Sequence, residues 1–146
     1  MSDLAQQLIA ENKRTRDPFL DLGNCGMSEI PAEVGDLVWL ESLSLASAWF
    51  EWNGQEWQER ESRNTGNKNN RWIDIRPLGK LTRLQSLIVE KVTALAPLDG
   101  LTKLQRLYLG DATGCDLTPL AKLTGLQGLV VLGKVSDLRP LGGLSA

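Results

Sequence analysis

The stretch Leu84-Gln85-Ser86-Leu87-Ile88-Val89 decides the fold, because close copies of it follow at residues 104–109 and 126–131. The copies start 20 and 22 residues apart, and each one follows the pattern L-x-x-L-x-L, with Val89 and Val131 in place of the last Leu in two of them. A single unit of this length cannot bury its apolar side chains, so neighbouring units stack and place their short strands side by side in a parallel sheet. The pattern predicts a repeat scaffold with a broad binding surface rather than a catalytic pocket.

The first half of the chain carries two further repeats and one break in the period. Repeats 1 and 2 occupy residues 17–45, and the second begins at Leu40, 44 residues before Leu84, which is twice a normal step. We therefore expect residues 46–72 to be an insertion, followed by the remaining repeats in 73–146, the last of them incomplete. Residues 1–146 are expected to form a single domain, with an amphipathic helix in 1–16 as its N-terminal cap.

Short segments with the pattern D-L-x-P-L, at residues 116–120 and 137–141, return the chain from one strand to the next. Proline fixes φ and removes a hydrogen-bond donor, which suits a tight turn outside a sheet. The segments are too short for a full helix. They therefore predict turns or single coils of 3₁₀ helix on the convex side.

The block Leu81-Thr82-x-Leu84-Gln85-x-Leu87, its copies and the D-L-x-P-L returns resemble the short leucine-rich repeats of bacterial internalins. The first return, I-P-A-E-V-G-D-L at residues 30–37, is similar to repeats of cytoplasmic bacterial proteins, including those with a Roco-type GTPase module. The resemblance implies an α/β solenoid, a horseshoe with a short parallel sheet on its concave face. One departure is the missing Asn at the ninth position of each repeat, so other groups must satisfy the buried backbone there. The residues at that position are Cys25, Ala48, Val92, Ala112 and Lys134.

The composition excludes several classes of function. A net charge of −2 gives no basic surface for nucleic acid, and no apolar run is long enough to cross a membrane. The chain has no histidine, the commonest general base and metal ligand, so we expect no enzyme, no metal and no cofactor. The two cysteines, Cys25 and Cys115, are expected to be buried reduced thiols. Without a signal peptide at the N-terminus, the sequence predicts a cytoplasmic protein.

The outward side chains of the strands form the first candidate binding surface, because strand side chains alternate between the two faces of a sheet. They predict an exposed apolar stripe on the concave face, flanked by charged residues, which is typical of a partner site. The alternative is that the insertion, or a segment beyond the last repeat, folds over the stripe. The predicted partner-binding residues on this face are Ile88, Glu90, Arg106, Tyr108, Val130 and Leu132.

The insertion is the second candidate surface, because it holds four of the five tryptophans of the chain: Trp49, Trp52, Trp57 and Trp72. Long loops in compact domains are usually functional or disordered, and aromatic anchors suit a binding loop. The alternative is that the tryptophans only pin the loop to the repeats. We expect Trp49 or Trp72 to rest on the repeats, and Trp52 and Trp57 to remain more available to a partner. A short linker in place of residues 53–70 is expected to leave the fold intact.

These observations favour a protein–protein interaction scaffold that binds through the concave sheet and the insertion. Two alternatives stay open. One is a regulatory repeat module of a larger enzyme, such as a Roco-type GTPase or a bacterial effector, and the other is carbohydrate binding by the insertion tryptophans. The last repeat has no visible cap, so self-association through its apolar edge is also expected.

Overall fold

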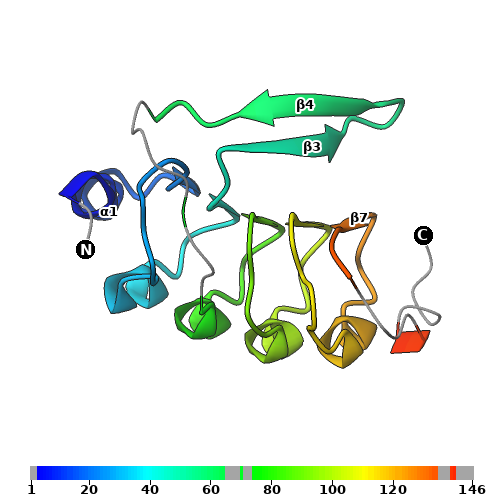
Figure 1. Ribbon diagram of the computed structural model, residues 1–146. Coiled ribbons are helices and arrows are strands. Elements are labelled where there is room, and N and C mark those ends of the chain that lie inside the picture. Colours follow the sequence, from blue (N-terminus) through cyan, green and yellow to red (C-terminus); the bar gives the residue numbers. More distant parts are fainter. Residues whose placement is uncertain (1–2, 65–69, 71–73, 135–138, 141–146) are drawn as a thin grey trace.

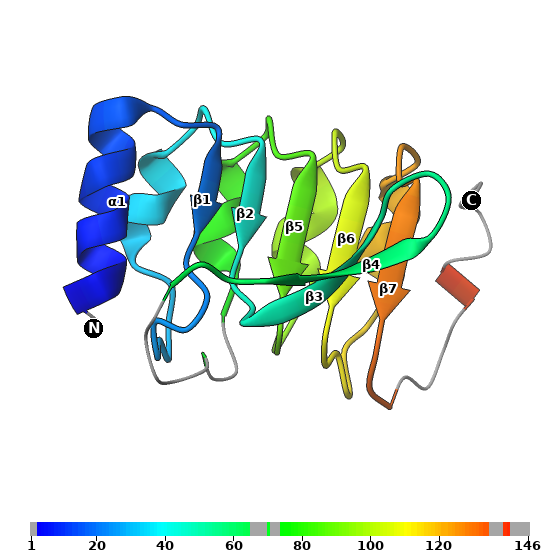
Figure 2. The ribbon, with the colours of Figure 1, turned by 90° about the horizontal axis from the view of Figure 1, so that it is seen from above.

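The computed structural model describes residues 3–64, 70, 74–134 and 139–140 of the chain. Its main element is a five-stranded parallel sheet in the order β1-β2-β5-β6-β7 (Figure 2). The strands are β1 (Phe19–Asp21), β2 (Ser42–Ser44), β5 (Ser86–Val89), β6 (Arg106–Leu109) and β7 (Gly128–Val131).

The register of the sheet aligns equivalent positions of successive repeats. Leu43 pairs with Leu87, Leu87 with Leu107, and Leu107 with Leu129. These leucines point into the core, where Leu43, Leu87 and Leu107 are almost completely buried. The L-x-x-L-x-L pattern thus produces parallel strands whose leucines stack in rows, as the sequence predicts.

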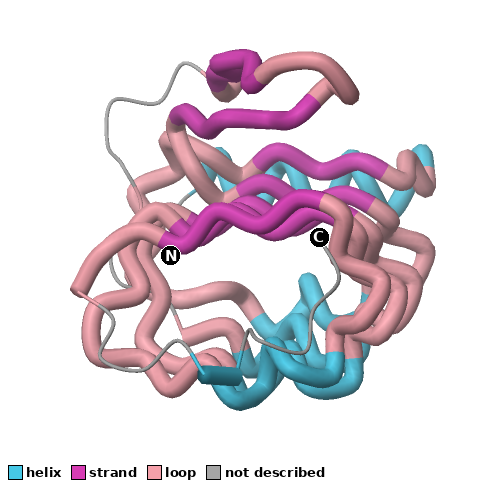
Figure 3. Tube along the Cα trace, turned by 90° about the vertical axis from the view of Figure 1, so that its right-hand side faces the viewer, coloured by secondary structure: helices cyan, strands magenta, loops and turns pink. Residues whose placement is uncertain are grey.

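The return segments form short 3₁₀ helices on the side of the core opposite the sheet (Figures 1 and 3). Three of them carry proline in their first turn. Each contributes one fully buried leucine or valine to the core, and none is longer than five residues, in agreement with the prediction of turns or 3₁₀ coils. The four are η1 (Ala32–Asp36), η2 (Arg76–Lys80), η3 (Ala96–Gly100) and η4 (Thr118–Lys122).

Helix α1 (Asp3–Thr15) covers the β1 end of the sheet (Figure 2). Its buried Asn12 donates from Nδ2 to the carbonyl oxygen of Asp17 at 3.0 Å and to that of Phe19 at 3.3 Å. The Oδ1 atom of Asn12 accepts a hydrogen bond of 2.7 Å from the indole of Trp39. The helix therefore satisfies a carbonyl at the otherwise open edge of β1, which is what a terminal cap of a repeat stack must do.

The insertion forms an antiparallel hairpin of β3 (Ala48–Trp52) and β4 (Trp57–Glu61). The hairpin lies above the sheet on the side away from the 3₁₀ helices and crosses over the strands (Figures 1 and 2). The face of the sheet opposite the 3₁₀ helices is therefore not the open surface expected from the sequence. The structure instead agrees with the alternative, in which the insertion folds over the predicted apolar stripe.

Asn70 compensates in part for the missing ninth-position asparagines. Its side chain is 3% exposed, and Nδ2 donates to the carbonyls of Leu22 at 3.0 Å and Leu45 at 2.7 Å. Its Oδ1 accepts a hydrogen bond of 2.9 Å from the amide of Met27. Asn70 thus joins repeats 1 and 2 from the far end of the insertion. The expectation that residues 53–70 can be replaced without affecting the fold is at odds with this contact.

In two later repeats, a thiol and the backbone itself satisfy the polar backbone groups of Val92, the residue at the ninth position. The Sγ atom of Cys115 donates to the carbonyl of Val92 at 3.5 Å, and the amide of Val92 donates to the carbonyl of Asp111 at 3.2 Å. Both Cys25 and Cys115 are free and buried, as predicted. Burial raises the pKa of the Cys25 thiol to about 11, and it raises the pKa of Cys115 as well.

Candidate functional site

The tip of the hairpin is closed by the Asn53-Gly54 pair. The Oδ1 atom of Asn53 accepts hydrogen bonds from the amides of Gln55 at 2.8 Å and Glu56 at 2.9 Å. Gly54 has φ of +99°, a conformation that side chains disfavour. At the other end, the Ser62 amide donates to the Ser47 carbonyl at 2.9 Å. The sequence therefore specifies a hairpin whose two stems leave the repeats side by side.

Trp49 seats the hairpin on the sheet. Its side chain is 8% exposed and packs with Ile88, which is 5% exposed, with buried Ala46, and with half-buried Tyr108. An ion pair of 3.4 Å between Glu51 on β3 and Arg106 on β6 adds a polar contact, and Glu51 also pairs with Arg60 on β4 at 3.3 Å. One buried indole and one partly exposed ion pair thus hold the hairpin above the middle of the sheet.

The second stem of the insertion is fixed to the first repeat by Asp21. Its carboxylate accepts hydrogen bonds from Ser62 Oγ at 2.9 and 2.8 Å and from the Arg63 amide at 3.0 Å. The side chain of Asn64 donates to the carbonyls of Asp21 and Gly23 at 2.9 and 2.8 Å. A Cβ atom at Gly23 would lie 2.3 Å from the Ala46 carbonyl oxygen, so this close crossing requires glycine. The base of the hairpin is therefore firmly placed.

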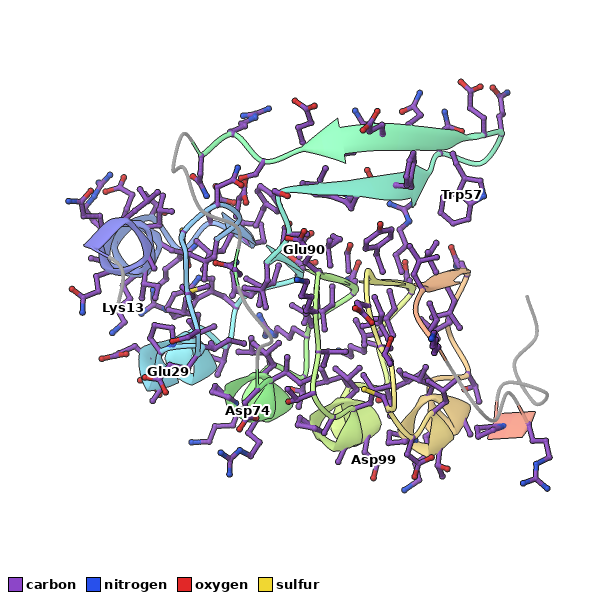
Figure 4. All side chains as sticks on the ribbon, viewed as in Figure 1. Lys13, Glu29, Trp57, Asp74, Glu90 and Asp99 are labelled. Carbon is purple, nitrogen blue, oxygen red and sulfur yellow. The ribbon has the colours of Figure 1, made fainter. Side chains whose placement is uncertain are left out.

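A narrow groove runs between the hairpin and the sheet, and its free volume is about 20 Å³, little more than one water molecule occupies. We call it the hairpin–sheet groove. Phe50 and Trp57 border it from the hairpin, and each is 48% exposed. Figure 4 shows Trp57 near the hairpin tip, on the β7 side of the molecule. The other lining residues are Trp49, Glu51, Ser86, Leu87, Ile88, Arg106, Leu107, Tyr108, Gly128 and Val130.

A wider hollow lies on the other side of the hairpin, towards β1. Phe19 and Trp49 are its apolar lining residues, and the rest are charged: Asp21, Glu59, Arg60, Glu61 and Arg63. Asp21 is already saturated by contacts with the stem, and Arg60 by contacts within the hairpin. Because this hollow is polar and its charges largely balance, the hairpin–sheet groove is the better candidate site.

Glu90 lies just past the end of β5, on the sheet side of the hairpin (Figure 4). Its side chain is half-buried, and its Oε2 atom is enclosed without a hydrogen-bond donor among the described residues. Tyr108, on the neighbouring strand, lies close enough to interact electrostatically with Glu90. Burial, and then the negative charge of Glu90, raise the pKa of the Tyr108 phenol. The carboxylate therefore sits next to an aromatic wall of the groove.

The predicted site residues divide into three groups. Arg106, Tyr108, Val130 and Trp57 come together around the hairpin–sheet groove. Ile88 also faces it, but the prediction of an exposed Ile88 is wrong, because Trp49 covers it. Glu90 and Leu132, which is 47% exposed, lie on the same face beyond the strand ends.

The expectations about the tryptophans are met where they fall on described side chains. Trp49 rests on the repeats and Trp57 is half-exposed, as predicted. The backbone of Trp52 pairs with Trp57, while the Trp52 side chain and all of Trp72 lie outside the described residues. The same holds for residues 65–69 of the insertion.

Sequence reasoning missed Phe50 and Glu51 as lining residues. The signal that could have placed them is the turn-favouring pair Asn53-Gly54, which opens the loop at residues 53–56 between Trp52 and Trp57. A hairpin prediction would have put residues 48–52 in a strand with alternating faces. It would still not have shown on which surface the hairpin rests, because that depends on contacts with Ile88 and Arg106 far along the chain.

Within the described part of the chain, no helix is long and apolar enough to cross a membrane. No group of three or more His, Cys, Asp or Glu side chains there is arranged to hold a metal ion.

The stacked L-x-x-L-x-L strands, the 3₁₀ returns and the capping helix define a leucine-rich-repeat protein, and the chain belongs to that class. It is similar to internalin C2 from Listeria monocytogenes, with 29% identity and a TM-score of 0.64. The similarity covers 87% of this chain but 47% of that one, so the chain spans less than half the length of this relative.

Two other solved structures match the chain at lower similarity. An internalin of the same Listeria species is 19% identical, with a TM-score of 0.49 over 82% of this chain and 36% of that one. A leucine-rich-repeat protein of Leptospira interrogans is 18% identical, with a TM-score of 0.48 over 86% of this chain and 34% of that one. No protein-family model and no curated protein matches the sequence significantly.

Proposed function

We propose that the chain is a protein-recognition module that binds a segment of a partner protein against the exposed aromatic border of the hairpin–sheet groove, without catalysis. The observation that carries this is the convergence of four aromatic side chains, Trp49, Phe50, Trp57 and Tyr108, on one groove. Exposed aromatic side chains that line a concave surface are typical of interface centres.

The division of labour within the hairpin supports this proposal. Trp49 is buried because it holds the hairpin on the sheet. Phe50 and Trp57, by contrast, line the groove and are each about half exposed to solvent. Exposed aromatic groups favour aggregation and need a reason to stay exposed. The leucine-rich repeat is, in addition, a scaffold commonly used for protein–protein interaction.

A displayed library of random peptides, selected against the full 146-residue chain, tests the proposal. The selected peptides should lose at least about tenfold in affinity towards Phe50→Ala and Trp57→Ala, a size typical of aromatic residues at interface centres. Val38→Ala is the matched control, because Val38 is also an exposed apolar residue and does not line the groove. Selection of no peptide, or equal affinity for all variants, would contradict the proposal.

We further propose that the protein resides in the cytoplasm, and that residues 1–146 act as one repeat domain. Support for the location comes from Cys25 and Cys115, which are both free and buried, as expected in a reducing compartment. Cell fractionation that places the chain outside the cytoplasm would contradict the first point. The roles of regulatory module and carbohydrate binder stay predictions.

A further inference from the structure

The register of the hairpin places Phe50 and Glu59 next to each other on one of its faces. The two residues stand directly opposite each other on β3 and β4. The amide of Ser62 donates to the Ser47 carbonyl, and pairs with hydrogen bonds alternate with pairs without them, so Phe50 and Glu59 form a pair of the second kind. The Cα atoms of such a pair lie about 4.5 Å apart, and their side chains are in close contact. An exposed aromatic ring and a carboxylate therefore lie side by side.

The seating of Trp49 determines which face of the hairpin a partner can reach. Side chains alternate along a strand, so Trp49 and Glu51 share the face opposite to that of Phe50. Trp49 is buried against Ile88, and Glu51 pairs with Arg106 at 3.4 Å, so the sheet occupies that face. The opposite face, which we call the aromatic–acidic face, carries four exposed side chains: Phe50, Trp57, Glu59 and Glu61.

The aromatic–acidic face has two carboxylates and no matching cation among the described residues. Glu59 and Glu61 are both exposed, and neither forms an ion pair there. Arg60, between them in the sequence, belongs to the other face, where it pairs with Glu51 at 3.3 Å. Arg63 follows β4 and forms no ion pair with a described residue either. The charge of this face is therefore complementary to a positively charged segment.

An arginine side chain fits this arrangement better than a lysine. Its guanidinium group is planar, so it can stack on an aromatic ring while its N–H groups pair with a carboxylate alongside. Phe50 and Glu59 offer both groups at the spacing of directly opposite strand residues. Each contact alone is weak at an exposed site, because water and salt screen it. Together, and covered by the backbone of a partner, the two contacts become stronger because the partner removes water from both.

We propose that the aromatic–acidic face recognises an arginine in the partner segment. The guanidinium group stacks on the ring of Phe50 and pairs with the carboxylate of Glu59, and a neighbouring apolar side chain of the segment packs on Trp57. Because these side chains lie on an open surface, this recognition needs no cavity. The inference rests on the proposed function and specifies the chemistry of the partner.

The peptides selected against the full chain provide the test. They should be enriched in arginine, more than in lysine, close to an aromatic or large aliphatic residue. Replacing that arginine by citrulline, which keeps the planar shape and removes the charge, should weaken binding by about tenfold. Against Glu59→Gln, arginine and citrulline peptides should differ by less than about threefold, because the carboxylate that pairs with the charge is gone. Glu59 is exposed and forms no ion pair with a described residue, so this variant should fold normally.

Glu29→Gln is the matched control, since Glu29 is an exposed glutamate near η1, on the far side of the core from the hairpin (Figure 4). This variant should retain the full difference between the arginine and citrulline peptides. Peptides that require Trp57 but show no preference for arginine, or a difference that survives in Glu59→Gln, would overturn the inference and leave the proposed function standing. Peptides that bind Phe50→Ala and Trp57→Ala as tightly as the unchanged chain would overturn both.

Discussion

The role of Asn70 as a bridge between repeats 1 and 2 gives a sharp stability prediction. Asn70→Ala removes two hydrogen bonds to the carbonyls of Leu22 and Leu45, and one from the amide of Met27. A buried hydrogen bond contributes about 1 kcal/mol, and an orphaned buried group costs about 1–3 kcal/mol. We therefore expect a loss of roughly 3 kcal/mol in the free energy of unfolding, measured by urea denaturation and far-UV circular dichroism.

Asn64→Ala is the matched control for this prediction. Asn64 also donates to two backbone carbonyls, those of Asp21 and Gly23, but it is only half-buried, so water can replace the lost donor. We expect a loss below about 1 kcal/mol for this variant. A loss for Asn70→Ala as small as that for Asn64→Ala would show that Asn70 does not serve as the bridge.

Three more predictions concern the core, a thiol and the last strand. Leu107→Ala, at an almost completely buried inward position, should reduce the free energy of unfolding by about 2–5 kcal/mol. Tyr108→Ala, at the half-buried neighbouring position, should reduce it by less than half as much. Equal losses in urea denaturation would show that the inward–outward register is wrong. Burial raises the Cys25 pKa from an ordinary 9.0 to about 11, so the unfolded chain ionises first and stability should fall between these pH values. This part of the fall should be missing in Cys25→Ala, and identical pH profiles of the two proteins would contradict it. Within the described residues no further strand pairs with β7, and Leu132 is 47% exposed. Light scattering should therefore show self-association that grows with protein concentration and is weaker in Leu132→Glu. A constant monomer mass would refute this prediction.

The repeat stack could be predicted from sequence because its determinants are local. Each inward leucine sits at a fixed place in L-x-x-L-x-L, and stacking repeats the same contact from strand to strand. The proline-containing returns predict 3₁₀ coils for the same reason. Both features are present in the structure without exception among the described repeats.

The site could be predicted only in part, because it depends on contacts between distant segments. Tyr108, Val130 and Arg106 were placed on the correct face by strand alternation alone. Nothing in the composition of the insertion shows that Trp49 lies on Ile88. The covering of the predicted stripe by the hairpin was therefore an open alternative from sequence.

Asn70 illustrates the same limit for the backbone. The absence of the ninth-position asparagines predicts that some other group must satisfy the buried carbonyls. The insertion contains several asparagines, and the sequence does not show which of them does so. Only the path of the chain back from the hairpin brings Asn70 between Leu22 and Leu45. The need could be inferred from sequence, and the residue that meets it could not.

The seating of the hairpin on the sheet is the central claim, because the groove and both proposals depend on it. Nuclear Overhauser effects between the indole ring of Trp49 and the methyl groups of Ile88 test it in solution most directly. The structure predicts clear cross-peaks, since these side chains pack together and are 8% and 5% exposed. Absence of these cross-peaks in the assigned spectrum of the full chain would show that the hairpin stands away from the sheet, and the groove as a binding site would be contradicted.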